Sequence, residues 1–105
     1  MAWQRVAKLS EIPESGLFRT EANGTGILII RDGEKLFVTS PRCTHEDDDL
    51  SSGILERGVL VCSFHSASFD PSTGAVVSPP EGGGDIGPLK TYGVKMEHDD
   101  VMVDC

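Results

Sequence analysis

The sequence lacks long apolar runs and any excess of positive charge. Its longest apolar stretches, such as Ile27 to Ile30, are only a few residues long, whereas a membrane-spanning helix needs about 20. Acidic residues number 17 against 9 basic ones, which gives a formal net charge of -8 at pH 7. This charge repels phosphate backbones and anionic lipid surfaces, so we expect neither a nucleic-acid nor a membrane partner.

Cysteine is scarce, and the pattern of a signal peptide is missing. The chain has 105 residues and 3 cysteines, too few for a disulfide framework, and metal ligation is the better use for two of them. Cys105 has no histidine near it in the sequence, and we assign it no function. Residues 1–5 run directly into alternating sequence. We therefore expect a cytoplasmic protein with a single domain over residues 1–105.

Short apolar alternations, divided by Gly, Pro, Asp and Ser, recur along the whole chain. No stretch keeps a helical period over a dozen residues, so the pattern predicts an all-β fold. Residues 9–14 allow one short helical turn, which Pro13 prevents from extending. Turn-favouring residues at 31–34, 56–58 and 98–100 predict hairpins. The predicted strands cover residues 3–8, 17–20, 26–30, 36–39, 53–55, 59–62, 68–70, 75–77, 91–97 and 101–104.

Two short segments carry the candidate metal ligands. The first contains Cys43 and His45, and the second contains Cys62 and His65, with residues 46–61 between them. Thiolate and imidazole are ligands that soft and borderline metals select, and two of each would complete a tetrahedral zinc site. A zinc-stabilised interaction module is therefore one alternative. Mixed segments favour one [2Fe-2S] cluster instead, with a thiolate from each loop on one iron and an imidazole from each on the other.

This arrangement resembles the Rieske-type ferredoxins, the small electron carriers of bacterial aromatic-ring oxygenase systems. In that family a Cys-x-His segment is followed by Cys-x-x-His, and the spacing is similar to that given by residues 46–61 here. The stretch from Cys62 to Gly74 is also similar to the family's second ligand loop. The resemblance extends over about residues 3–104. It implies that Cys43 and Cys62 bind one iron and that His45 and His65 bind the other.

The resemblance also implies a fold and a set of partners. The Rieske fold would have an antiparallel β-sandwich base from about residues 1–41 and 78–105, with a cluster-binding subdomain inserted at about 42–77. The partners would be a flavin-containing NAD(P)H reductase and a terminal oxygenase, and a Rieske subunit of another redox complex is the second alternative. No nucleophile, general base or substrate pocket is evident, so we expect an electron-transfer component and not an enzyme.

Several positions near the ligands bear on the redox behaviour and on docking. Relatives commonly have proline and glycine where this chain has Ser63 and Ser66. High-potential members place a Ser and a Tyr hydroxyl where this chain has Ala67 and Phe69, so the potential should lie at the low end of the Rieske range of about -150 to +300 mV. The candidates for a docking face beside the cluster are Leu50, Phe64, Pro79 and Pro80.

Overall fold

The computed structural model describes residues 3–13, 15–42, 50–62, 66–78 and 87–104. Within these ranges the chain forms ten strands, all paired antiparallel, and two short 3-10 turns, so the predicted all-β fold is confirmed. In none of the described residues does a helix reach the length and apolarity needed to cross a membrane. The elements are β1 (Trp3–Lys8), η1 (Leu9–Glu11), β2 (Ser15–Ala22), β3 (Thr25–Asp32), β4 (Lys35–Thr39), η2 (Leu50–Ser52), β5 (Ile54–Glu56), β6 (Val59–Val61), β7 (Ser68–Phe69), β8 (Val76–Ser78), β9 (Thr91–Glu97) and β10 (Asp100–Asp104).

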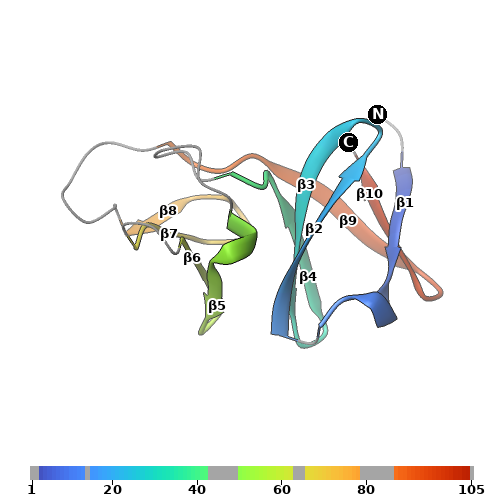
Figure 1. The fold of residues 1–105 in the computed structure, drawn as a ribbon, viewed down its shortest axis with the longest axis horizontal. Helices are drawn as coiled ribbons and strands as arrows, with labels where there is room; N and C mark the ends of the chain where they lie inside the picture. The colour runs from blue at the N-terminus through green and yellow to red at the C-terminus, as the bar shows by residue number, and fades with distance from the viewer. Residues whose placement is uncertain (1–2, 14, 43–49, 63–65, 79–86, 105) are drawn as a thin grey trace.

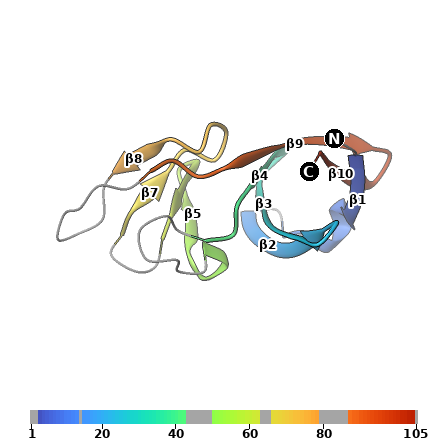
Figure 2. The same cartoon turned by 90° about the horizontal axis from the view of Figure 1, so that it is seen from above.

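Six strands from the two ends of the described chain form the large sheet, in the order β1-β10-β9-β4-β3-β2. Its two halves are joined where β4 pairs with β9, through Val38 with Tyr92 and Thr39 with Thr91. The sheet bends at this junction, so that β2 and β3 lie over β1, β9 and β10 (Figures 1 and 2) and the edge strands β1 and β2 come into contact. This two-layered arrangement is the β-sandwich base that the resemblance implied.

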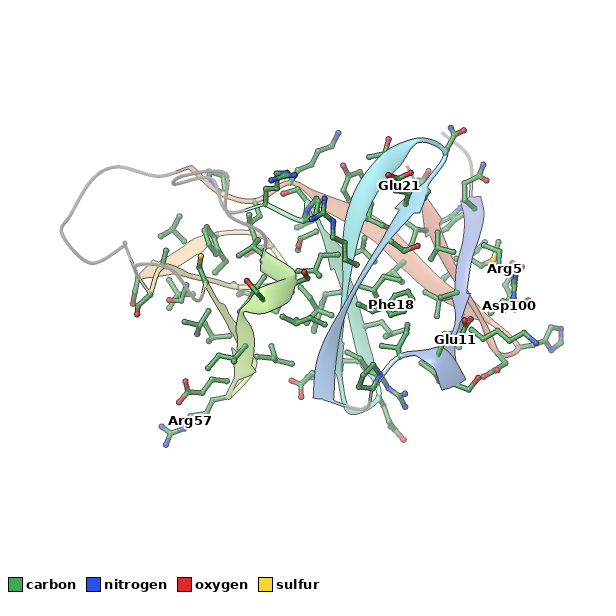
Figure 3. The ribbon with its side chains drawn as sticks, in the orientation of Figure 1. Arg5, Glu11, Phe18, Glu21, Arg57 and Asp100 are labelled. Carbon is green, nitrogen blue, oxygen red and sulfur yellow. The ribbon has the colours of Figure 1, made fainter. Side chains whose placement is uncertain are left out.

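The interior of the large sheet holds one hydrophobic cluster, here called the base core. Phe18 on β2 points into it and packs against its members (Figure 3). Strands from both halves of the sheet contribute to this cluster, which is why the sheet must fold onto itself. The buried members of the base core are Ala7, Ile12, Ala22, Ile27, Ile29, Val38, Val101 and Val103.

The other four strands form a small sheet in the order β5-β6-β7-β8, which lies beside the large one (Figure 1). A cross-strand row of apolar side chains, Leu55, Leu60, Phe69 and Val76, follows its pairing register. All four belong to or pack against a second cluster, here called the inter-sheet core, which holds the two sheets together. Its buried members are Leu28, Ile30, Leu50, Leu60, Cys62, Ala67, Phe69 and Leu89.

Strand β3 lies between the two cores and contributes side chains to both. Residues 27–30 are four consecutive apolar residues, each with 0% of its surface exposed. Since side chains alternate along a strand, Leu28 and Ile30 enter the inter-sheet core while Ile27 and Ile29 enter the base core. Burial of each such side chain contributes about 1.5 to 3 kcal/mol. One strand thus stabilises both halves of the molecule.

Each predicted strand has a counterpart in the structure, and β1 and β9 have the predicted bounds. Strands β2 and β3 are longer than predicted, because their pairing runs from Ser15 with Asp32 to Ala22 with Thr25. The short turn expected near residues 9–14 is η1. The turn η2, directly after the first predicted ligand segment, was not predicted.

Candidate metal centre

Only one of the four predicted ligands lies within the described residues. Cys62 directly follows β6, is 1% exposed and belongs to the inter-sheet core. The other three, Cys43, His45 and His65, lie outside the described residues. The structure therefore describes the framework from which the two ligand segments extend.

The first ligand segment begins and ends at adjacent points of this framework. The Leu50 amide donates a hydrogen bond to the Pro41 carbonyl at 2.8 Å, which brings together the two sides of residues 42–49. Leu50 itself is 0% exposed, so burial fixes the point where the segment re-enters the fold. It follows that Leu50 cannot form part of a docking face, and that candidate was wrong. The other docking candidates, Phe64, Pro79 and Pro80, lie outside the described residues.

The second ligand segment is closed in a similar way. The Cys62 amide donates to the Ala67 carbonyl at 2.8 Å, so the two buried residues on either side of residues 63–66 are held together. Directly before Ala67, the exposed Ser66 has a φ of 58°, in the left-handed region that glycine occupies without steric cost. The resemblance had marked this position, because relatives commonly have glycine there.

Both ligand segments start from the same hydrophobic cluster. Leu50 anchors the first segment, Cys62 and Ala67 anchor the second, and all three belong to the inter-sheet core. The described ends of the two segments therefore lie in one part of the fold. Ala67 and Phe69 are both fully buried and carry no hydroxyl group that could donate a hydrogen bond toward that centre.

A tight turn after β7 is hydrogen-bonded to Leu89, and so connects the segment before β9 to this framework. The Asp70 carboxylate accepts hydrogen bonds from the Ser72 amide at 2.9 Å and the Ser72 hydroxyl at 2.7 Å. These bonds, the hydroxyl first, hold the pKa of Asp70 below its usual value. Gly74, with a φ of 78°, accepts a hydrogen bond from the Leu89 amide at 2.8 Å. A Cβ at Gly74 would lie 2.1 Å from the Leu89 carbonyl oxygen, so only glycine fits this junction.

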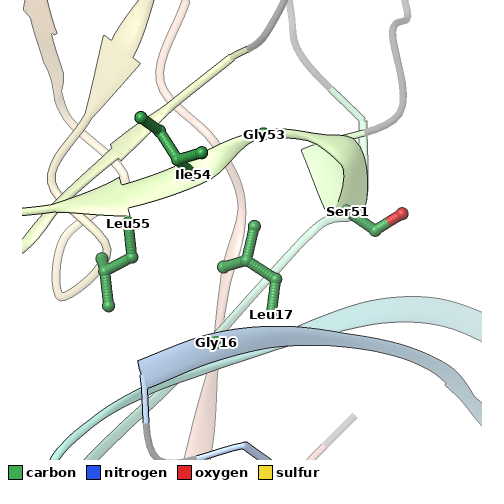
Figure 4. Close-up of a pocket in the computed structure, with 6 residues that line it drawn as sticks. All are labelled: Gly16, Leu17, Ser51, Gly53, Ile54 and Leu55. Atoms are coloured by element: carbon green, nitrogen blue, oxygen red, sulfur yellow. The ribbon is translucent and has the colours of Figure 1, made fainter.

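Two surface crevices are lined by described residues. One, of about 280 Å³, lies between β2 and the η2–β5 segment (Figure 4). The other, of about 180 Å³, lies beside β4, β9 and the turn after β7. Neither lining includes a carboxylate, a histidine or a cysteine, so the hydroxyl groups in these crevices have no such neighbour to activate them for catalysis. The residues of the first lining are Gly16, Leu17, Ser51, Gly53, Ile54 and Leu55, and those of the second are Leu36, Phe37, Val38, Pro71, Ser72, Thr91, Tyr92 and Val94.

Comparison with known proteins gives a consistent result. A model of the Rieske [2Fe-2S] domain matches residues 2–93. The ferredoxin component of biphenyl 2,3-dioxygenase from Rhodococcus jostii (strain RHA1) is 35% identical over 104 residues, covering 99% of this chain and 94% of the relative. The ferredoxin component of the naphthalene 1,2-dioxygenase/salicylate 5-hydroxylase systems of Ralstonia sp is 32% identical and covers 96% and 93% of the two chains.

Solved structures show the same likeness. The Sphingomonas yanoikuyae B1 ferredoxin superposes with a TM-score of 0.86 at 26% identity, covering 99% of both chains. A chain in the complex of reduced oxygenase and oxidized ferredoxin in carbazole 1,9a-dioxygenase gives a TM-score of 0.84 at 28% identity, covering 96% of this chain and 91% of that one.

Proposed function

The chain belongs to the Rieske [2Fe-2S] domain family, and from that premise we propose that it is a ferredoxin that carries single electrons to a terminal oxygenase. The observation that carries this conclusion is the 35% identity to a dioxygenase ferredoxin component over nearly the full length of both chains. The relatives named as ferredoxin components of dioxygenase systems support an electron-transfer role and not catalysis by this chain.

The proposed ligands are Cys43 and Cys62 on one iron and His45 and His65 on the other. Two thiolates and two imidazoles are the donor set of a Rieske centre, and when bound the [2Fe-2S] cluster supplies a one-electron redox couple. The surroundings of Cys62 fit this use, because its burial in the inter-sheet core keeps water away from a thiolate ligand. The closed bases of the two ligand segments would hold them in place while the charge of the site changes.

We assign the base to about residues 1–41 and 78–105 and the cluster-binding subdomain to about 42–77. The large sheet draws its strands from the first and last parts of the chain, and the small sheet runs from Ile54 to Ser78, which supports this division. Ala67 and Phe69 bring no hydroxyl to the site, which supports a potential at the low end of the Rieske range.

The proposed electron donor is a flavin-containing NAD(P)H reductase, and the proposed acceptor is a terminal oxygenase. A related solved structure is described as a complex of an oxygenase with a ferredoxin. The net charge of -8 suits docking onto a basic surface of either partner. NAD(P)H-driven turnover that requires reductase, this chain and terminal oxygenase together would separate a carrier from a fixed subunit of another redox complex.

The metal centre is tested with purified, iron-reconstituted protein. We expect visible absorption, two irons per chain and loss of both in the Cys62→Ser variant. The Cys105→Ser variant is the matched control and should keep colour and iron, since Cys105 has no place in the proposed ligand set. A colourless wild-type chain with stoichiometric zinc would support the interaction module instead, and an unchanged spectrum in Cys62→Ser would refute the ligand assignment.

A further inference from the structure

Gly53 occupies the point where the framework of one ligand segment meets that of the other. It lies between η2 and β5, and its amide donates to the Leu50 carbonyl at 3.0 Å. It also faces the backbone of Val61, the residue before Cys62. Leu50 directly follows residues 43–49, so Gly53, which lies between η2 and β5 (Figure 4), is close both to the end of the first segment and to the start of the second.

This contact has no room for a side chain. A Cβ on Gly53 would lie 2.3 Å from the Val61 carbonyl oxygen and 3.1 Å from the Leu50 carbonyl oxygen. Both neighbouring atoms are backbone, so neither can rotate away as the end of a flexible side chain could. A methyl group would require the two backbones to separate by about 1 Å to reach ordinary van der Waals contact.

The surroundings restrict how this separation could be absorbed. Val61 is paired on both sides, with Ile54 on β5 and Ser68 on β7, so it cannot move without disturbing the small sheet. Leu50 is fully buried and hydrogen-bonded to Pro41. The strain would therefore be passed to the two ligand segments, which leave the framework directly beside these residues.

We propose that Gly53 is a positioning residue that sets the separation of the two ligand segments and so the spacing of the ligands they carry. The inference rests on the proposed function. Bond lengths at a metal centre vary by only about 0.2 Å, so a displacement of about 1 Å in one segment is not absorbed by the ligand bonds. A change at Gly53 should thus act on the metal centre while the base, on the other side of β3, keeps its fold.

The test compares Gly53→Ala with Gly87→Ala in the iron-reconstituted chain. Gly87 is the matched control, because a Cβ there meets nothing within 4 Å. The readouts are the rate at which a chelator removes iron, the electron paramagnetic resonance spectrum of the reduced protein, and the fluorescence of Trp3, the single tryptophan, on β1 of the base. For Gly53→Ala we expect iron loss at least about tenfold faster and a shifted resonance spectrum, with the Trp3 signal of the wild type. Gly87→Ala should match the wild type in all three.

Two results would overturn the inference. Wild-type iron retention and an unshifted spectrum in Gly53→Ala would show that the ligand spacing does not depend on this contact. Loss of the native Trp3 signal together with the iron would make Gly53 a residue needed for folding in general. A wild-type chain that binds no iron would contradict the proposed function as well, which separates that failure from a failure of this inference alone.

Discussion

Two adjacent residues on β3 allow the two cores to be perturbed separately. Ile29 and Ile30 share a strand, a residue type and an exposed fraction of 0%, yet Ile29 lies in the base core and Ile30 in the inter-sheet core with Cys62. Replacing each with valine removes one methylene from one core and leaves the other core intact. Because the positions are otherwise matched, a difference between the variants reports on the cores.

The size of the expected loss in stability follows from the complete burial of both side chains. An Ile→Val change at a fully buried site lowers the free energy of unfolding by about 1 kcal/mol, so both variants should show that loss in global unfolding. We expect iron loss to require only that the small sheet opens away from the base. Ile30→Val weakens that contact directly, so local opening and chelator-driven iron loss should become about fivefold faster. Ile29→Val should leave the rate of iron loss unchanged.

The assay is chelator-driven decay of visible absorbance, measured well below the urea midpoint, alongside urea unfolding followed by Trp3 fluorescence. Trp3 lies on β1, so its signal reports unfolding of the base. Equal acceleration of iron loss in both variants would show that the chain opens as a single unit. That result would refute the division into two cores that this reasoning draws from β3.

Two further predictions concern the second ligand loop and the turn after β7. Ser66→Gly should raise the free energy of unfolding by about 0.5 to 1 kcal/mol, because relief of the left-handed backbone outweighs the added entropy of the unfolded chain. As the control, Ser10→Gly in η1 should lower the free energy of unfolding in the same urea titration. No increase in stability for Ser66→Gly would contradict the strain at that residue. The lowered pKa of Asp70 means that its ionised form stabilises the fold above its unfolded pKa of about 3.9, and that this contribution is lost as the pH falls through the folded value. Ser72→Ala removes the main donor to Asp70, so its urea midpoint should fall less steeply than that of the wild type below about pH 4, and parallel curves would rule out this contribution.

The sequence was most informative where a pattern is local. The alternation in residues 3–8 and 91–97 predicted β1 and β9 with their bounds, and the turn residues at 56–58 predicted a hairpin whose Arg57 and Gly58 do take positive φ values. The Rieske likeness could be inferred from the spacing of two short segments, because ligand identity and spacing are linear features. The turn at Asn23 and Gly24 was missed although Asn-Gly is a strong hairpin signal.

Features that depend on contacts between distant segments could not be read in this way. Leu50 looked like a docking residue because it lies close in sequence to the expected cluster ligands, but the inter-sheet core buries it completely. The three-residue turn η2 is too short to have a periodicity. The close approach of Gly53 to the Val61 carbonyl arises from strand pairing, and nothing in the residues around Gly53 indicates it. The placement of Cys43, His45 and His65 stays a prediction.

The burial of both faces of β3 has a consequence for the chain before it is folded. Residues 27–30 offer a newly made chain four apolar residues with no polar face, three of them β-branched isoleucines, which is the kind of segment that associates with copies of itself. Arg31 and Asp32 follow the run directly and act as charged gatekeepers. Strands β2 and β4 pair with the two edges of β3 and are connected to it by two-residue turns. Residues 27–30 can therefore be covered by local pairing before strands distant in sequence pair.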